Sequence, residues 1–304
     1  MSGTPSIPLG VSYSTASGSS VIDFLATHYT LPGPMECALL KRGFNDSFEV
    51  RGADGQRYVL RVSGRRARCD ADVASETEFL AYLEKEGVPV AAPEPTRDGK
   101  LFTLGLLPEG KRPIVLFRHA EGRSPQAGSL ADARTQGKTL ARIHTAADHF
   151  ARRNTGRFRL DLDYLLHRPV AAVLSVKSLA VEPRDCLAAL ASRLSASIAA
   201  IDGLTWTRCH GDCHGGNARI AEDGRATFFD FDDGGPGYLA YDLAVYLWAQ
   251  VSFQRQRYPM WHAFIDGYRS IRVITPTDLE AVLLFVAIRP FGSWVSMSIT
   301  SRVG

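Results

Sequence analysis

Long apolar runs are missing from this sequence of 304 residues. No stretch reaches the roughly 18 consecutive apolar residues that a membrane-spanning helix requires. The N-terminal stretch also lacks the basic start and apolar core of a secretory leader. We therefore expect a cytoplasmic protein that has no membrane partner.

Cysteines and clustered cations are scarce as well. The five cysteines are an odd number and too few for a disulfide scaffold, so we expect reduced thiols. The net charge is only +3, and the cations form no dense run of the kind that nucleic-acid surfaces show. These features argue against a nucleic-acid partner and leave the oligomeric state open.

The composition indicates a packed fold with two lobes. Hydrophobic residues make up 45% of the chain and charged residues 22%, and the length is enough for two cores. Residues 1–20 are rich in Ser, Thr, Gly and Pro and favour a flexible arm. We expect a first lobe over residues 21–120 and a second over residues 121–304.

The first lobe has the pattern of a small antiparallel sheet. Residues 48–50 and 57–62 have strand character and flank a turn at residues 53–55, which predicts a hairpin. Further strands are expected over residues 101–106 and 114–117. A helix through residues 76–83 interrupts them.

The remainder of the chain is mainly helical. A breaker-rich stretch at residues 121–125 precedes a helix over residues 130–150, whose small and apolar residues recur on one stripe. A section of loops and strands follows around residues 205–235. The order of elements therefore predicts the α+β class.

The residues that carry chemistry lie in that last section. His210, Asp212 and Asn217 have the spacing of the kinase catalytic loop, in which an Asp and an Asn are five residues apart. Asp230 follows the next apolar run. Phosphoryl transfer requires a base beside the attacking hydroxyl and oxygen ligands for Mg²⁺. Asp212 is a candidate base, and Asn217 and Asp230 are candidate Mg²⁺ ligands.

Two other interpretations of this segment compete. Cys209, His210, Cys213 and His214 offer zinc-ligand atoms, although closed zinc sites usually draw ligand pairs from two separated segments. Isolated carboxylates often cap turns or helices. The joint spacing of the Asp and Asn residues favours phosphoryl transfer over both.

These motifs resemble those of the aminoglycoside phosphotransferase and choline kinase superfamily. The pattern H-G-D-x-H-x-x-N spans residues 210–217, D-F-D-D spans residues 230–233, and D-L-A spans residues 242–244. The resemblance extends over about residues 40–290. It implies a protein-kinase-like fold with a small N-terminal antiparallel β lobe and a larger, mainly helical C-terminal lobe.

The resemblance also implies roles for individual residues. Asp212 corresponds to the catalytic base, and Asn217 and Asp230 correspond to the ligands of Mg²⁺ bound with ATP. His210, His214 and Asp242 correspond to residues that support the catalytic loop. The hinge that meets the adenine corresponds to Leu116, Phe117, Arg118 and His119.

The nucleotide site departs from the family pattern at two places. Arg61 stands where a phosphate-binding Lys is expected, and it would pair with Glu76 through a longer and geometrically stricter group. No G-x-G-x-x-G loop is present. Residues 43–47 take its place, and Ser47 is the candidate phosphate contact there.

The motifs predict a phosphotransferase that acts on a small-molecule hydroxyl. Amino alcohols, amino acids such as homoserine, aminoglycosides and sugars all remain open as acceptors. A bacterial Ser/Thr protein kinase of the stress-response type and a catalytically weak nucleotide-binding regulatory module are the alternatives. We expect relatives to continue through another helix beyond residues 289–292, so a truncated C-terminus is also open.

Overall fold

The computed structural model describes residues 10–64, 69–150, 158–252 and 255–301. The chain forms two compact units. Residues up to Asp70 and residues Pro93–His119 make the first unit, and Ala71–Ala92 with Ala120–Ser301 make the second. Residues 71–92 thus belong to the second unit, although the sequence placed them in the first lobe.

A five-stranded antiparallel sheet forms the first unit, in the order β1-β2-β3-β5-β4. The strands are β1 (Glu36–Arg42), β2 (Asp46–Arg51), β3 (Arg57–Val62), β4 (Thr103–Leu107) and β5 (Gly110–Arg118). The β2–β3 hairpin agrees with the sequence prediction. Strand β1 was not predicted. Six of its seven residues are exposed, so it lacks the alternation by which a half-buried strand is recognised.

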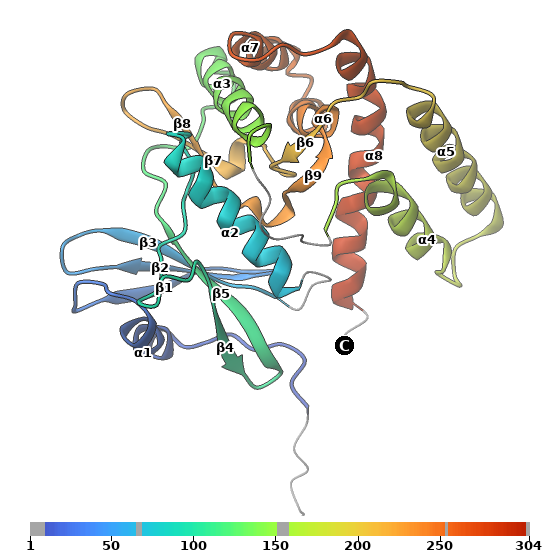
Figure 1. Cartoon of the computed structure of the whole chain (residues 1–304). Helices are drawn as coiled ribbons and strands as arrows, with labels where there is room; N and C mark the ends of the chain where they lie inside the picture. The colour runs from blue at the N-terminus through green and yellow to red at the C-terminus, as the bar shows by residue number, and fades with distance from the viewer. Residues whose placement is uncertain (1–9, 65–68, 151–157, 253–254, 302–304) are drawn as a thin grey trace, which may run out of the picture. The chain divides into compact units, whose positions relative to one another are not determined.

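Helix α1 (Gly18–His28) contributes the core under this sheet (Figure 1). It begins at Gly18, because the Ser17 Oγ accepts a hydrogen bond from the Ser20 backbone N–H at 3.2 Å and caps the helix. The fully buried members of this core are Val21, Leu25, Tyr29, Phe48, Val50, Leu60, Val62, Ile114 and Leu116.

The segment before α1 is attached to the sheet, in contrast to the flexible arm expected over residues 1–20, of which residues 1–9 lie outside the described chain. The Tyr13 hydroxyl donates to the Asp46 carboxylate at 2.7 Å. The Ser14 hydroxyl donates to Glu109 at 2.6 Å. These contacts tie the segment to β2 and to the β4–β5 turn.

The second unit is mainly helical. Its helices are α2 (Asp70–Lys85, whose first residue belongs to the first unit), α3 (Leu130–Ala147), α4 (Arg168–Leu174), α5 (Val181–Ala199), α6 (Leu239–Val251), α7 (Tyr258–Arg269) and α8 (Pro276–Ser301). Short turns of helix are η1 (Asp163–His167), η2 (Gly215–Asn217) and η3 (Phe231–Asp233). Two small sheets pair β6 (Trp206–Cys209) with β9 (Gly235–Tyr238) and β7 (Ala218–Ile220) with β8 (Ala226–Phe228).

This architecture confirms the predicted α+β class, with the sheet in one unit and most helices in the other. Residues 289–292, beyond which relatives are expected from the sequence to continue, lie inside α8, which extends to Ser301. Within the described ranges, no helix combines the length and the apolar character that crossing a membrane demands.

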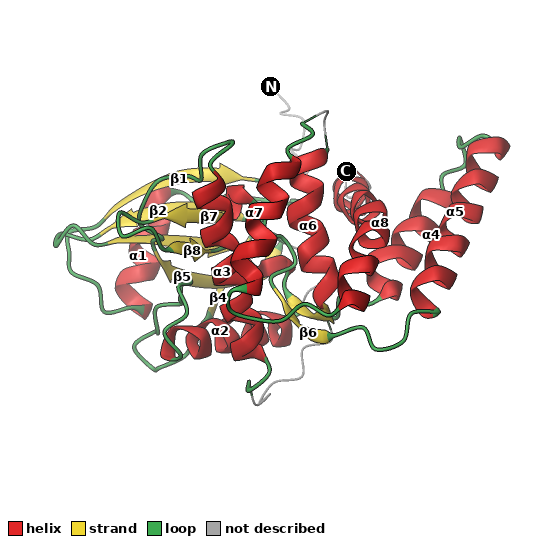
Figure 2. Ribbon diagram, turned by 90° about the horizontal axis from the view of Figure 1, so that it is seen from above, coloured by secondary structure: helices red, strands yellow, loops and turns green. Residues whose placement is uncertain are grey.

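Helices α3 and α7 run side by side with their backbones in contact (Figure 2). A Cβ atom on Gly137 would lie 2.0 Å from the Phe264 carbonyl oxygen, and one on Gly267 would lie 2.0 Å from the Arg134 carbonyl oxygen. Only glycine permits such an approach on both helices. The close contact brings His144 of α3 and Tyr268 of α7 together near residues 210–217, as described below.

Candidate active site

The candidate catalytic loop, residues 210–217, begins where β6 ends, at a turn that requires glycine. Gly211 has φ 83°, and a Cβ atom there would lie 2.0 Å from the Asp233 carbonyl oxygen. Any side chain would therefore collide with the backbone that follows Asp230. The turn sets the position of the next residue, Asp212.

Asp242, in the first turn of α6, holds this loop from below. Its side chain is fully buried and accepts backbone N–H groups of His210 at 2.7 Å and of Gly211 at 2.8 Å. The His144 Nε2 lies 3.0 Å from the same carboxylate, and the His144 Nδ1 lies 2.7 Å from the Tyr268 hydroxyl. The α3–α7 contact thus supports the loop through one buried carboxylate.

His210 connects the loop to the strand that precedes Asp230. Its Nδ1 accepts the backbone N–H of Asp212 at 3.2 Å, and its Nε2 donates to the Phe229 carbonyl at 3.1 Å. Burial lowers the pKa of His210, so the ring is neutral at neutral pH. The Asn217 carbonyl accepts the Phe229 backbone N–H at 3.1 Å. Phe229 is therefore hydrogen-bonded to His210 and to Asn217, at the two ends of the loop, and Asp230 is the next residue in the chain.

Three donors surround the Asp212 carboxylate. The Asn217 amide donates to Oδ2 at 2.9 Å, the His214 Nε2 lies 3.3 Å from the same oxygen, and Arg289 is bonded to Oδ1. The His214 Nδ1 accepts the Gly216 backbone N–H at 2.9 Å, which leaves Nε2 as the donor. Burial alone would raise the pKa of Asp212, but His214 and Arg289 outweigh it and hold this pKa below its usual range. The carboxylate is ionised at neutral pH.

Asn217 and Asp230 have the donor chemistry of a divalent-cation site. The Asn217 amide nitrogen donates to both the backbone carbonyl and the carboxylate of Asp212, which leaves its oxygen as the ligand atom. Asp230 has φ 65° and ψ 59°, a left-handed conformation that non-glycine residues seldom adopt outside functional sites. Amide and carboxylate oxygens suit Mg²⁺. The residues present therefore fit this ion.

The zinc interpretation of the same loop finds no support in the geometry. Among the described residues, the cluster that could hold a metal joins Cys209 to His144 and Asp242, without Cys213, His210 or His214. In that cluster, the Cys209 Sγ already donates to the Tyr238 carbonyl at 3.3 Å. The cluster is explained by the hydrogen bonds that hold the loop.

The candidate nucleotide residues are distributed over both units. Ser47 and Arg61 are paired across β2 and β3, and the guanidinium of Arg61 lies 5.0 Å from the ring centroid of Phe117. Arg61 is only 4% exposed. The expected hinge residues Leu116, Phe117, Arg118 and His119 lie at the end of β5 and just after it. Glu76 is buried on α2, in the second unit.

The sequence did not single out Arg289 as a site residue. Its guanidinium donates to the Tyr241 hydroxyl at 2.9 Å and to the Asp212 carboxylate, and its side chain is 13% exposed. It lies on α8, 77 residues beyond Asp212. The sequence offers one sign of its position, because it is a cation within an apolar helix and directly precedes Pro290.

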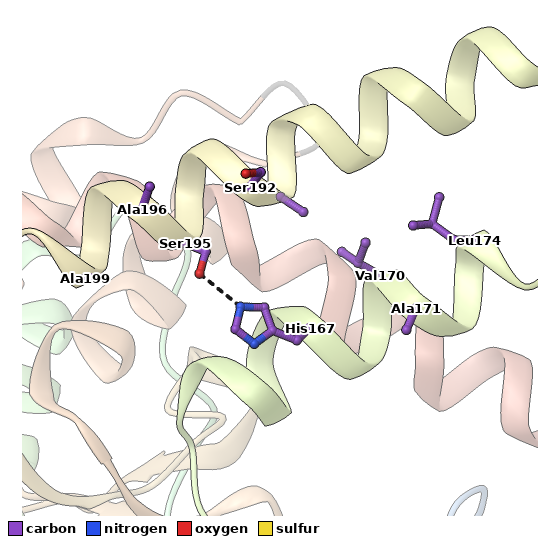
Figure 3. Close-up of a pocket in the computed structure, with 9 residues that line it drawn as sticks. His167, Val170, Ala171, Leu174, Ser192, Ser195, Ala196 and Ala199 are labelled. Atoms are coloured by element: carbon purple, nitrogen blue, oxygen red, sulfur yellow. Dashed lines mark hydrogen bonds between the residues drawn. The ribbon is translucent and has the colours of Figure 1, made fainter.

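A groove of about 580 Å³ lies between α4 and α5 (Figure 3). The side chains of His167 and Ser195 meet across it at 3.0 Å, and its other described lining residues are small or apolar. None of the candidate catalytic or metal-binding residues lines it. The groove is therefore separate from the site at the catalytic loop.

Comparison with known proteins identifies the class. The model of the phosphotransferase enzyme family matches residues 37–274, and the chain belongs to this family. It is a kinase-type enzyme that transfers a phosphoryl group to a hydroxyl acceptor.

Individual relatives agree with this assignment. The chain is 37% identical to an uncharacterized protein of Deinococcus radiodurans, over 91% of this chain and 81% of that protein. It is 27% identical to homoserine kinase of Caulobacter vibrioides, over 84% and 78%. Its fold is similar to that of an amicoumacin kinase in complex with AMP-PNP, Ca²⁺ and Ami, with a TM-score of 0.77 at 16% identity over 95% and 92% of the two chains.

Proposed function

We propose that the protein transfers the γ-phosphate of ATP to the hydroxyl of a small molecule. Asp212 is the catalytic base in this proposal, and Asn217 and Asp230 hold Mg²⁺. The homoserine kinase relative and the amicoumacin kinase structure support a small-molecule acceptor. The nucleotide and the divalent cation that accompany the latter structure support the cofactors.

The observation that carries the proposal is the fixed position of Asp212 beside Asn217. The amide of Asn217 donates to Asp212 twice, and Asp242 and His210 fix the backbone of the loop on either side. Rate acceleration in phosphoryl transfer comes mainly from positioning and electrostatic stabilisation. A loop restrained by this many hydrogen bonds provides the positioning.

The residues of the chain would act in a defined order. Asp212 accepts the hydrogen bond of the acceptor hydroxyl and orients its oxygen, and it receives the proton as the new bond to phosphorus forms. Asn217 and His214 hold the carboxylate in the orientation that this requires. When bound, Mg²⁺ would neutralise charge on the phosphates.

The nucleotide side of the proposal depends on the sheet and on α2. Arg61 and Ser47, which are paired across β3 and β2, would contact phosphate, and Glu76 on α2 is the expected partner of Arg61. The guanidinium of Arg61 supplies the charge that a Lys provides in the family pattern, in a stricter geometry. The end of β5, from Leu116 to His119, would meet the adenine.

The test is ADP production from ATP and Mg²⁺ over a panel of amino alcohols, amino acids, aminoglycosides and sugars. With an active acceptor, Asp212→Asn should lower kcat by about 1,000-fold or more, because the base and its charge are lost. Asp223→Asn, on the exposed turn between β7 and β8, is the matched control and should retain full activity. Unchanged kcat in Asp212→Asn would refute the assignment of the base, and the absence of turnover with all acceptors would favour the regulatory-module alternative.

A further inference from the structure

A buried cation lies directly beside the candidate base. The guanidinium of Arg289 is bonded to the Asp212 carboxylate, on the side opposite to Asn217. Both groups lie within the second unit, and the arginine side chain is only 13% exposed. Any acceptor whose hydroxyl reaches Asp212 must therefore come close to this positive charge.

Arg289 has more hydrogen-bond donors than the site uses. A guanidinium carries five N–H groups. One bonds to the Tyr241 hydroxyl and one to Asp212, while the Nε is buried and has no hydrogen-bond partner among the described residues. A buried donor left without an acceptor destabilises a protein unless a ligand satisfies it. Arg289 therefore has the capacity to bind an anionic group.

Electrostatics favours an acceptor of one charge class. In a site of low exposure, charges interact more strongly than they do in water. Asp212 and Asp233 also lie in the electrostatic environment of Arg289, so the selection acts on the acceptor group that contacts the guanidinium itself. An ammonium group there would be repelled by Arg289, whereas a carboxylate would be attracted and could accept the Nε–H. A guanidinium that lies between Asp212 and the carboxylate of the acceptor also weakens the repulsion between these two negative groups.

We propose that the acceptor is a hydroxy acid, and that Arg289 binds its carboxylate while Asp212 accepts the hydroxyl proton. This inference rests on the proposed function and names its substrate class. Arg289 bonded to Asp212 places the two recognised groups of the acceptor within a few bonds of each other. Hydroxy amino acids and simple hydroxy acids both meet this requirement.

The transfer step balances without a further reactant. The acceptor oxygen forms a bond to the γ-phosphorus, and its proton passes to the Asp212 carboxylate. The bond from the γ-phosphorus to the bridging oxygen breaks, and ADP leaves with the electron pair. The carboxylate of the acceptor takes no part in the bond changes and serves only for recognition.

The first test compares matched acceptors with the wild-type protein. Homoserine, glycerate and γ-hydroxybutyrate carry the carboxylate, whereas homoserine amide, glycerol and aminopropanol lack it. We expect kcat/KM for the best acid to exceed that of its uncharged or cationic counterpart by about 100-fold or more, as for sites built to bond a polar group. Equal or higher values for the compounds without a carboxylate would overturn the inference and leave the proposed function intact.

The second test removes the charge of Arg289. Arg289→Met keeps much of the aliphatic stem of the side chain. In this variant, kcat/KM for acids should fall until the ratio of kcat/KM for an acid to that for its amide is about one. The control Arg142→Met, at an exposed position of α3, should keep the wild-type ratio. If Arg289 only positions Asp212, the variant will lower activity on both classes equally, which contradicts the proposal. Arg289→Lys replaces it if circular dichroism shows that the Met variant is unfolded, and it should retain only part of the preference.

A binding measurement separates failure of the inference from failure of the proposed function. Calorimetric titration of the protein with homoserine and with homoserine amide requires no turnover. If the wild-type protein binds homoserine but not homoserine amide, and Arg289→Met binds neither, the carboxylate site is supported even when no phosphate is transferred. Turnover of an acceptor whose binding is indifferent to the carboxylate supports the proposed function and refutes this inference.

Discussion

In each unit of the molecule, a buried charged side chain holds distant backbone segments together. In the second unit it is Asp242, which accepts two backbone N–H groups of the catalytic loop and the ring of His144. In the first unit it is Arg112, 1% exposed, which donates to the backbone carbonyls of Ser14, Val62 and Ser63. A carboxylate collects donors in one unit, and a guanidinium collects acceptors in the other.

The difference lies in what surrounds each charge. Among the described residues, the Asp242 carboxylate is hydrogen-bonded to the N–H groups of His210 and Gly211 and to the ring of His144, so its charge is shared with the loop that carries Asp212. Arg112 lies 3.1 Å from the Glu109 carboxylate and 4.0 Å from that of Asp46, both buried. We infer that Asp242 matters for catalysis as well as stability, whereas Arg112 matters mainly for stability.

Asp242→Ala should have the largest effect. It leaves the N–H groups of His210 and Gly211 buried without an acceptor, which costs about 4 kcal/mol in the free energy of unfolding. It also frees the loop, and we expect kcat to fall by about 100-fold or more, as for lost supporting contacts at other sites. Urea unfolding and steady-state kinetics at saturating acceptor measure the two effects.

The matched control for Asp242 is Asp278, another buried aspartate of the second unit. Its carboxylate accepts the backbone N–H of Thr205 at 2.8 Å and the hydroxyl of Thr275 at 2.8 Å, and the Thr275 Oγ caps α8 by accepting the Asp278 backbone N–H at 3.0 Å. Asp278→Ala should destabilise the protein by about 2 kcal/mol. Its kcat should change far less than that of Asp242→Ala, and a similar loss in both variants would argue against a specific role of Asp242.

Arg112→Met should lower the free energy of unfolding by about 3 kcal/mol, because it leaves Glu109 and Asp46 buried without their cation. The activity of the molecules that remain folded should stay within about threefold of wild type, since Arg112 touches no candidate catalytic residue. Thermal unfolding and kcat per folded molecule are the measurements. A large loss of kcat at unchanged stability would reverse the comparison between the two units.

Tyr13→Phe tests whether the N-terminal segment belongs to the Arg112 network. The hydroxyl donates to Asp46 at 2.7 Å, and the ring centroid lies 4.8 Å from the Arg112 guanidinium carbon. Loss of a hydrogen bond to a charged group should cost about 1.5 kcal/mol, while the ring contact is kept. Tyr13→Ser also removes the ring and should lower the free energy of unfolding further. Equal stability of Tyr13→Phe and wild type would show that the Tyr13 hydroxyl contributes nothing to this network.

The parts of the molecule that could be predicted from sequence are those whose signals are local. Asp212 and Asn217 are five positions apart, and the structure joins them by a hydrogen bond at 2.9 Å, while the role of Asp230 as a metal ligand stays a prediction. The β2–β3 hairpin was likewise marked by a turn between two apolar runs. Such signals depend on few residues and on nearby ones.

Arg289 and Arg112 escaped prediction because their partners are far away in sequence. Arg289 is bonded to a residue 77 positions earlier, and Arg112 to carbonyls 49, 50 and 98 positions earlier. Periodicity reports which face of an element is buried, but not which distant element covers it. A lone arginine on an apolar element was therefore indistinguishable from one whose head group reaches solvent.

The smallest effect is expected where a similar network is half-exposed, at Asp132 near the start of α3. Arg123 donates to both oxygens of this carboxylate, at 2.6 and 2.9 Å, and lowers its pKa, but the arginine side chain is 47% exposed. Solvent screening limits the contribution, so Asp132→Asn should cost about 1 kcal/mol at pH 7.

The pH dependence of that loss distinguishes charge from packing. A carboxylate whose pKa is lower in the folded state stabilises the protein above its unfolded pKa of about 3.9, and this stabilisation fades as the pH falls through the folded value. The difference in unfolding free energy between wild type and Asp132→Asn should therefore be constant from about pH 7 to 5 and shrink below about pH 4. Urea unfolding at successive pH values measures it. If the difference does not shrink on acidification, Asp132 acts through the geometry of its hydrogen bonds, as a neutral residue would. In that case, burial of the charge alone does not determine how much each network contributes to the free energy of unfolding.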